Sequence, residues 1–397
     1  MASFYHGSYI RYAIGSLGLT VRSVTKTLRR TLRPTKYSAD VFERRADIPR
    51  LIRHRDWKGL SAVLEDTATL AERTGDPTPL QKAGQAFERL GDLNRAARFR
   101  LAARRMLKGE NDSDWSGEII HGEGLLIDLV EDDPRSLGRV IRHARLAGHA
   151  ASRASSATIR VEARLVTLMQ RTFPNAVIVS AEQKIAGRKF ATFEHLASVF
   201  ARDAKELAAS FVPLQADPAM VEAFRERYRA MTDKPLVGLS WGSKSHTKDV
   251  PGFSHWADFM ARMPAAFVSL QYGPIQGALR RLRKGRQVQL IHDESVDQMV
   301  DMDRFAAQIA ALDAVVTISN TTAHLAGALG VPSIFVIDDN FQTFWPVNAD
   351  HTPWYPRGVV LRKNGRAWSS VLDEAEHILV RLLSTHSHSE PAGSSDR

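Results

Sequence analysis

The chain of 397 residues contains no cysteine. This absence excludes disulfide bonds, a thiolate nucleophile and cysteine-based zinc sites, and it fits a reducing compartment. No apolar run approaches the ~20 residues that a membrane-spanning helix requires. The fourteen histidines form no H-E-x-x-H or comparable ligand pattern, so no metal site is predicted. A G-x-G-x-x-G segment after a first strand is also missing, which argues against a dinucleotide-dependent dehydrogenase.

Acidic residues are absent from residues 1–37, whereas the whole chain carries a net charge of +10. The segment contains seven cations: Arg11, Arg22, Lys26, Arg29, Arg30, Arg33 and Lys36. Without them the rest of the chain has a net charge of +3. The body of the chain is therefore nearly balanced. Because it also lacks zinc-finger, KH and RNP signatures, a nucleic-acid partner is not expected.

The basic segment 1–37 has the pattern of an amphipathic helix. The cations occupy one sector of such a helix. Apolar residues recur with helical spacing on a separate sector, at Ile10, Ile14, Leu17, Val21, Val24 and Leu28. Such a helix can lie on an anionic membrane surface, so residues 10–33 are a candidate peripheral membrane contact. A frayed tail, or a helix packed on the body of the protein, is the alternative. The expected location is cytoplasmic, with peripheral contact at the inner face of the membrane.

Residues 38–112 show helical patterns and no strand pattern. Between Leu80 and Leu107, small and aromatic residues have spacings that resemble one tetratricopeptide unit: Gly84, Phe87, Gly91, Ala96 and Ala103. A single unit cannot form a solenoid, so a helical cap or a lone helical hairpin is expected here.

Strand and helix patterns alternate after residue 112, which indicates α/β architecture with parallel sheets. A break at Thr232–Pro235 separates two domains, expected at 113–234 and 235–385. The second domain has the cleaner pattern, with strands predicted at 236–241, 266–272, 288–292, 314–319, 333–337 and 359–361. Residues 386–397 are expected to be a disordered polar tail.

The clearest site pattern is the junction of a strand at 314–318 with a helix that begins at Thr321. Asn320, Thr321 and Thr322 place polar side chains and unpaired N–H groups at the positive end of the helix dipole. This arrangement suits a diphosphate. His324, one turn into the helix, could reach a phosphate or ribose. A well-capped helix without a ligand is the alternative, since Asn and Thr are common N-caps.

The segment from Ser319 to Pro332 resembles the diphosphate-binding segment of heptosyltransferase-like and tetratricopeptide-linked glycosyltransferases, the latter similar to O-GlcNAc transferase. Four further motifs follow the family's order: 237–241 (VGLSW), 267–273 (FVSLQYG), 344–346 (FWP) and 354–356 (WYP). The resemblance covers 235–370. It implies a GT-B fold, with two Rossmann-like domains facing across a cleft, preceded by the small all-helical tetratricopeptide-like segment.

The resemblance implies a metal-independent glycosyltransferase that needs no cofactor. Its donor would be a nucleoside-diphosphate sugar, and its acceptor a protein or glycan. In the related enzymes a Lys or Arg after the first strand of this domain stabilises the charge that develops on the leaving diphosphate. Lys244 and Lys248 match it here, and Lys244 lies closer to the strand end. Gly242 in the same loop and Gln271 at the next strand end are further candidate donor-binding residues.

The acceptor side departs from the family pattern. In place of a glycine-rich loop, the first strand of 113–234 runs into Glu131, Asp132 and Asp133. An inverting transfer needs a base, and Asp132 is the representative candidate among these carboxylates. An acidic loop of this kind is also typical of a solvated turn. The alternative function is therefore a non-catalytic GT-B-fold protein that binds nucleotide or acts as a scaffold.

Overall fold

The structure is a computed structural model that describes residues 50–51, 54, 56–109, 111–130, 137–183, 185, 189–244, 248–283, 288–339, 345–347 and 349–386. The predicted basic segment 1–37, the carboxylates Glu131–Asp133 and the tail 387–397 lie outside these residues. The chain forms two compact units, Met1–Leu80 and Gln81–Arg397. Within the described ranges, no helix combines the length and apolarity that crossing a bilayer requires.

The first unit contains helix α4 (Trp57–Thr74). The carboxylate of Asp56 caps its start by accepting a hydrogen bond of 2.8 Å from the backbone N–H of Gly59. Gly75 ends the helix in the left-handed conformation, at φ 70°. Leu60, Leu64 and Ala68 recur every fourth residue and are buried, so one face of α4 carries its packing.

The boundary between the units falls within helix α5 (Pro77–Arg89), which is followed by α6 (Leu93–Lys108). Gly91 turns the chain between them at φ 80°. Phe87 and Phe99 stack with their ring centroids 5.5 Å apart. A Cβ on Gly84 would lie 2.7 Å from Cγ of Arg100, so the helices approach closely there. The helical hairpin is present, and its likeness to a tetratricopeptide unit stays a prediction.

A four-stranded parallel sheet follows, in the order β3-β2-β1-β4. Its strands are β1 (Ile120–Asp128), β2 (Ala154–Val161), β3 (Val177–Ser180) and β4 (Lys189–Ala191). The helices around it are α7 (Leu137–Ala151), α8 (Val166–Thr172) after a short 3-10 turn (Ala163–Leu165), α9 (Phe193–Phe200), α10 (Ala204–Ala209) and α11 (Pro218–Arg229). Strand β4 was not predicted because three residues are too short for a period-2 pattern.

The second sheet has six parallel strands in the order β10-β9-β8-β5-β6-β7. They are β5 (Leu236–Ser240), β6 (Ala266–Ser269), β7 (Leu290–Ile291), β8 (Ala314–Ile318), β9 (Ser333–Ile337) and β10 (Gly358–Arg362). The helices are α12 (Phe253–Arg262), α13 (Gln276–Arg283), α14 (Met302–Ala310), α15 (Thr321–Ala328) and α16 (Trp368–His386). The chain first builds outward from β5 to β7 and then from β8 to β10. The direction of winding therefore reverses between the neighbours β5 and β8.

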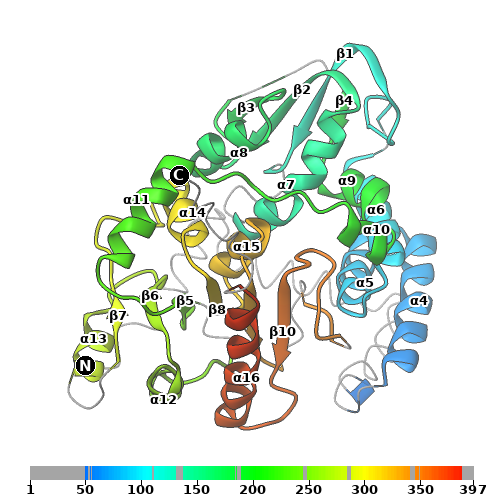
Figure 1. The fold of residues 1–397 in the computed structure, drawn as a ribbon. Helices are drawn as coiled ribbons and strands as arrows, with labels where there is room; N and C mark the ends of the chain where they lie inside the picture. Colours follow the sequence, from blue (N-terminus) through cyan, green and yellow to red (C-terminus); the bar gives the residue numbers. More distant parts are fainter. Residues whose placement is uncertain are drawn as a thin grey trace, which may run out of the picture. The chain divides into compact units, whose positions relative to one another are not determined.

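Helices cover both faces of this sheet (Figure 1). Val316 and Ile334 pack with α12 and α16 on one face. Val315 and Phe335 belong to the core on the other face, with α14 and α15. Burial on both faces explains the continuous apolar runs of β5, β8 and β9. The predicted α/β architecture with parallel sheets is confirmed.

Candidate functional site

The predicted diphosphate segment lies where the winding of the six-stranded sheet reverses. Open parallel sheets bind ligands in the crevice beyond the carboxyl ends of their strands, at such a switch point. Here the loops after β5 and β8 meet, and the side-chain N–H of Asn320 donates a hydrogen bond of 2.9 Å to Oγ of Ser240. The fold therefore places Asn320–Thr322 at the expected position for a ligand.

Asn320 is the N-cap of α15. Its Oδ1 accepts a hydrogen bond of 3.1 Å from the backbone N–H of Ala323. The described part of the chain supplies no acceptor for the backbone N–H groups of Thr321 and Thr322. Two donors are thus left at the positive end of the helix dipole, which can serve an anion.

Ser319 is held from two sides. The indole N–H of Trp345, which is fully buried, donates a hydrogen bond of 2.8 Å to its Oγ. The Nζ of Lys248 donates to its carbonyl oxygen. Burial lowers the pKa of Lys248, while the charge of Asp338 acts in the opposite direction. The structure therefore brings a half-buried ammonium group next to the start of α15.

His324 lies in a packed aromatic cluster. Its Nδ1 is 2.8 Å from the hydroxyl of Tyr355, and its ring stacks on Trp345 with the centroids 5.4 Å apart. A Cβ on Gly138 would lie 2.7 Å from Cδ2 of His324, so α7 is in contact with the ring. Burial, followed by the charges of Arg142 and Lys248, lowers the pKa of His324 to about 3. The imidazole is therefore neutral near pH 7, and these contacts give it a packing role.

The pH dependence of stability tests this burial. The pKa of His324 is lower in the folded chain than the unperturbed value of about 6.5, so the unfolded state binds more protons below that value. Stability is therefore lost as pH falls from about 6.5 toward 3, by about 2 kcal/mol at pH 5. Urea unfolding of His324→Gln should show a loss smaller by this amount between pH 7 and pH 5.

The exposed His121, replaced by Gln, is the control and should leave the pH slope unchanged. His143 is also buried with its pKa lowered well below the usual value, so the His324→Gln variant should keep part of the dependence. Equal slopes for His324→Gln and the unmodified chain would contradict a neutral, buried His324.

Gln271 shapes the loop after β5. Its Oε1 accepts hydrogen bonds of 3.0 Å and 2.7 Å from the backbone N–H groups of Trp241 and Gly242. The backbone N–H of Lys244 donates 2.5 Å to the hydroxyl of Tyr272, and its Nζ lies 5.5 Å from the centroid of that ring. The structure thus places Lys244 beside Tyr272 and Lys248 beside Ser319. Residues 245–247 between these lysines lie outside the described residues.

A row of arginines on α7 was missed by the sequence analysis. Arg142 is buried, forms an ion pair with Glu88 (Nη1 to Oε1, 2.6 Å), and lies 4.8 Å from the ring centroid of Trp354. Arg139 and Arg145, three residues to either side, lie against Phe193 and Trp354. The available signal was the spacing of the arginines, which occupy positions 139, 142 and 145 of the sequence. The proposed base, Asp132, lies outside the described residues.

Within the described ranges, no group of three or more His, Asp or Glu side chains converges in a way that could hold a metal ion.

Comparisons with known proteins give one curated relative. No protein-family model matches the chain. Protein FlbA of Caulobacter vibrioides is 29% identical over 266 residues, which cover 61% of this chain and 44% of FlbA. The match therefore spans less than half of that protein's length.

Two glycosyltransferases are among the solved structures that are similar to the chain. A family 9 glycosyl transferase from Veillonella parvula has a TM-score of 0.49 and 12% identity, covering 69% of this chain and 100% of that one. The ADP-heptose LPS heptosyltransferase II of E. coli also has a TM-score of 0.49, with 13% identity, covering 66% and 99% of the two chains.

Proposed function

We propose that the protein transfers a sugar from a nucleoside-diphosphate sugar to a protein or glycan acceptor. The observation that carries this proposal is the arrangement at the carboxyl ends of β5 and β8. Two backbone donors at Thr321 and Thr322 lie at the start of α15, and the ammonium group of Lys248 is held at Ser319 beside them. Diphosphates suit such combinations of helix N–H groups and a fixed cation.

In the proposed reaction an acceptor oxygen attacks the anomeric carbon of the sugar. A bond from that carbon to the acceptor forms, and its bond to the diphosphate oxygen breaks. Negative charge then grows on the leaving β-phosphate, where Lys248 and the dipole of α15 would stabilise it without a metal ion. The acceptor's proton passes to a base, for which Asp132 is the proposed residue. Lys244 is proposed as a second, exposed cation near the phosphates.

In this proposal the six-stranded sheet, with Gln271 and Gly242 shaping one wall, holds the donor. The four-stranded sheet and the helices around it would select the acceptor, in a GT-B arrangement. Residues 10–33 are proposed to make a peripheral membrane contact that would bring the protein near membrane-associated acceptors. The nucleoside and the sugar are left open.

A non-catalytic role is the second candidate, and the contact between α7 and α15 favours it. Gly138 lies directly against His324, and Arg142 and Trp354 fill the adjacent space. This packing removes His324 from the surface that a ribose or phosphate would contact. A protein with this arrangement could bind a nucleotide, or serve as a scaffold, without transferring a sugar.

A calorimetric and thermal-shift screen against nucleoside diphosphates and their sugars tests the proposal. Ligands that bind only the folded state raise the melting temperature. Thr321→Pro tests the backbone donor, because proline is accepted at the first helical position and removes the N–H group together with the side-chain hydroxyl. The preceding Asn320 already has the extended backbone that proline requires of its neighbour, at φ -156° and ψ -172°. Affinity should fall about tenfold, the equivalent of one hydrogen bond to a charged group.

Thr321→Ala is the matched control. It keeps the N–H group and loses the hydroxyl, so its affinity should stay close to that of the unmodified chain. An equal loss of affinity in both variants would contradict a role for the backbone N–H group of Thr321. No stabilisation by any nucleotide at millimolar concentration would remove the transferase proposal. Binding without transfer to any acceptor would favour the non-catalytic role.

A further inference from the structure

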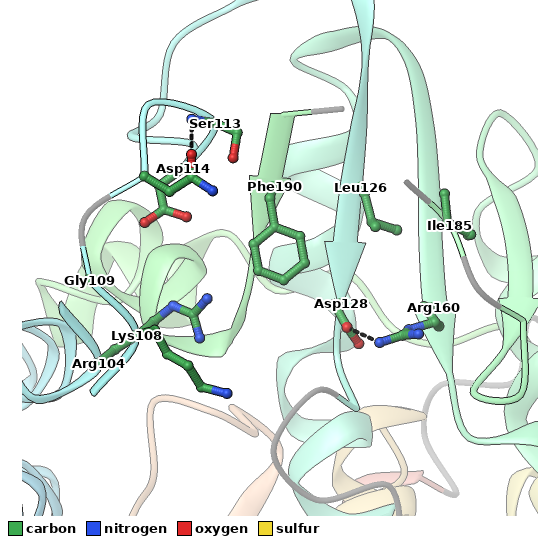
Figure 2. A pocket seen from close by; sticks show the side chains of 11 residues that line it. Arg104, Lys108, Gly109, Ser113, Asp114, Leu126, Asp128, Arg160, Ile185 and Phe190 are labelled. Carbon is green, nitrogen blue, oxygen red and sulfur yellow. Dashed lines mark hydrogen bonds and ion pairs between the residues drawn. The ribbon is translucent and has the colours of Figure 1, made fainter. Parts of the chain in front are cut away.

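A pocket of about 490 Å³ lies on the four-stranded sheet, on the face turned away from the main core. Alternate residues of a strand point to opposite faces. Leu125 and Ile127 belong to the core that includes α7, so Leu126 and Asp128 point the other way. Leu126 is in register with Phe190 of β4, and Asp128 with Arg160 of β2. Figure 2 shows these four side chains along one side of the pocket.

The opposite wall comes from the end of α6 and the loop after it. Arg104 and Lys108 extend toward the ring of Phe190, with the guanidinium carbon of Arg104 5.5 Å from the ring centroid (Figure 2). Ser113 and Asp114 lie in the upper part of this wall in Figure 2, and Asn111 also lines the pocket. The pocket thus combines an apolar and aromatic floor with polar and cationic sides.

Among the described residues that line the pocket, three are cations (Arg104, Lys108 and Arg160) and two are carboxylates. Both oxygens of Asp128 are already engaged. Its Oδ1 accepts a hydrogen bond of 3.0 Å from the backbone N–H of Val130, and its Oδ2 accepts one from Nη2 of Arg160. The Nε of Arg160 is buried, and no described residue accepts its hydrogen bond. The other carboxylate, Asp114, lies with its Oδ2 3.6 Å from Nε2 of His195.

We propose that this pocket binds a small molecule in which a phosphate or carboxylate group is attached to a sugar-sized ring. Arg104 and Lys108 would bind the anionic group, since both can donate charge-assisted hydrogen bonds. The ring would lie on Phe190 and Leu126, with its hydroxyl groups near Asn111 and Ser113. The volume falls within the range of about 300–1,000 Å³ that is typical of small-molecule sites.

This site is separate from the proposed donor site at the carboxyl ends of β5 and β8. Its described lining residues come from α6, the loop after it, and the four-stranded sheet with its connections. The inference therefore goes beyond the proposed function and holds or fails without it.

The test uses the full chain with ¹³C-labelled isoleucine methyl groups, because Ile185 lines the pocket. Glucose-6-phosphate, glucuronate, glucose and inorganic phosphate are titrated separately, and an Ile185→Val spectrum assigns the signal. Glucose-6-phosphate, glucuronate or both should shift the Ile185 signal saturably, whereas glucose should not. Which of the two binds distinguishes a phosphate from a carboxylate ligand.

Lys108→Glu should weaken the binding about tenfold, because it reverses a charge beside the anion. Arg105→Glu is the matched control, since Arg105 is an exposed residue of α6 that does not line the pocket. It makes the same change in net charge, and its binding should be unchanged. Circular dichroism would confirm that both variants melt like the unmodified chain.

Four results would each overturn the inference. The first is an equal loss of affinity in the two variants, and the second is binding of glucose as tight as that of the charged sugars. The third is a shift of the Ile185 signal with inorganic phosphate as strong as with the charged sugars. The fourth is no shift of this signal at millimolar ligand.

Discussion

Lys248→Met is expected to weaken the binding of a nucleoside diphosphate about 100-fold. A charge-assisted hydrogen bond to a phosphate contributes about 1.5–3 kcal/mol, and its upper range corresponds to a factor of this size. Lys248 is suited to this role because it is half-buried beside the start of α15, where water screens its charge less than at an exposed site. Methionine keeps most of the apolar stem, so the packing of the side chain is largely retained.

Lys244→Met is the matched control, and calorimetry of both variants is the measurement. Lys244 is exposed and lies over the ring of Tyr272, so its removal should change the affinity only a few-fold. The order of the two effects is what the structure adds, because the sequence favoured Lys244 by its distance from the strand end. A larger loss in Lys244→Met than in Lys248→Met would place the diphosphate nearer the loop tip and contradict the site described here.

Glu88→Gln is expected to lower the free energy of unfolding by about 3–5 kcal/mol. The carboxylate of Glu88 is buried and pairs with two arginines, Arg100 and Arg142. The pKa of Arg142 is lowered to about 10 by burial, while Glu88 acts in the opposite direction. Glutamine has nearly the same shape, so the variant removes the charge and leaves two arginines facing each other.

Urea unfolding at pH 7 measures this effect, and Glu222→Gln is its control. Glu222 is exposed on α11, and its substitution should change stability by no more than about 0.5 kcal/mol. If Glu88→Gln were equally mild, the arginines around α7 would be stabilised mainly by their contacts with aromatic rings. The fold would then depend much less on the link between α5 and α7.

The six-stranded sheet was the most predictable part of the molecule. Its central strands are buried on both faces, so each appears as an apolar run, and the predicted strand 333–337 coincides with β9. The four-stranded sheet was less predictable. Residues 121–123 of β1 are exposed and show no apolar alternation, so the start of the strand at Ile120 could not be predicted. Residues 193–209 form two helices, α9 and α10, since Asp203 caps a new start before Ala204.

The candidate site was predictable where it depends on local chemistry. A strand followed by Ser319–Thr322 defines a helix start whatever packs around it. The choice between Lys244 and Lys248 depended instead on a long-range contact. Lys248 donates a hydrogen bond to Ser319, which lies 71 residues away in the sequence. The partners of His324 are likewise distant: Tyr355 is 31 residues away, and Gly138 lies on another sheet's helix. Spacing along the chain carries no information about such contacts.

The most direct test of the central claim is a crystal structure of the protein with the nucleoside diphosphate that stabilises it best. We expect the β-phosphate within hydrogen-bonding distance of the backbone N–H groups of Thr321 and Thr322 and of the Nζ of Lys248. The nucleobase of the ligand would then lie toward the loops after β5 and β6. A nucleotide bound elsewhere, with the start of α15 unoccupied, would contradict it.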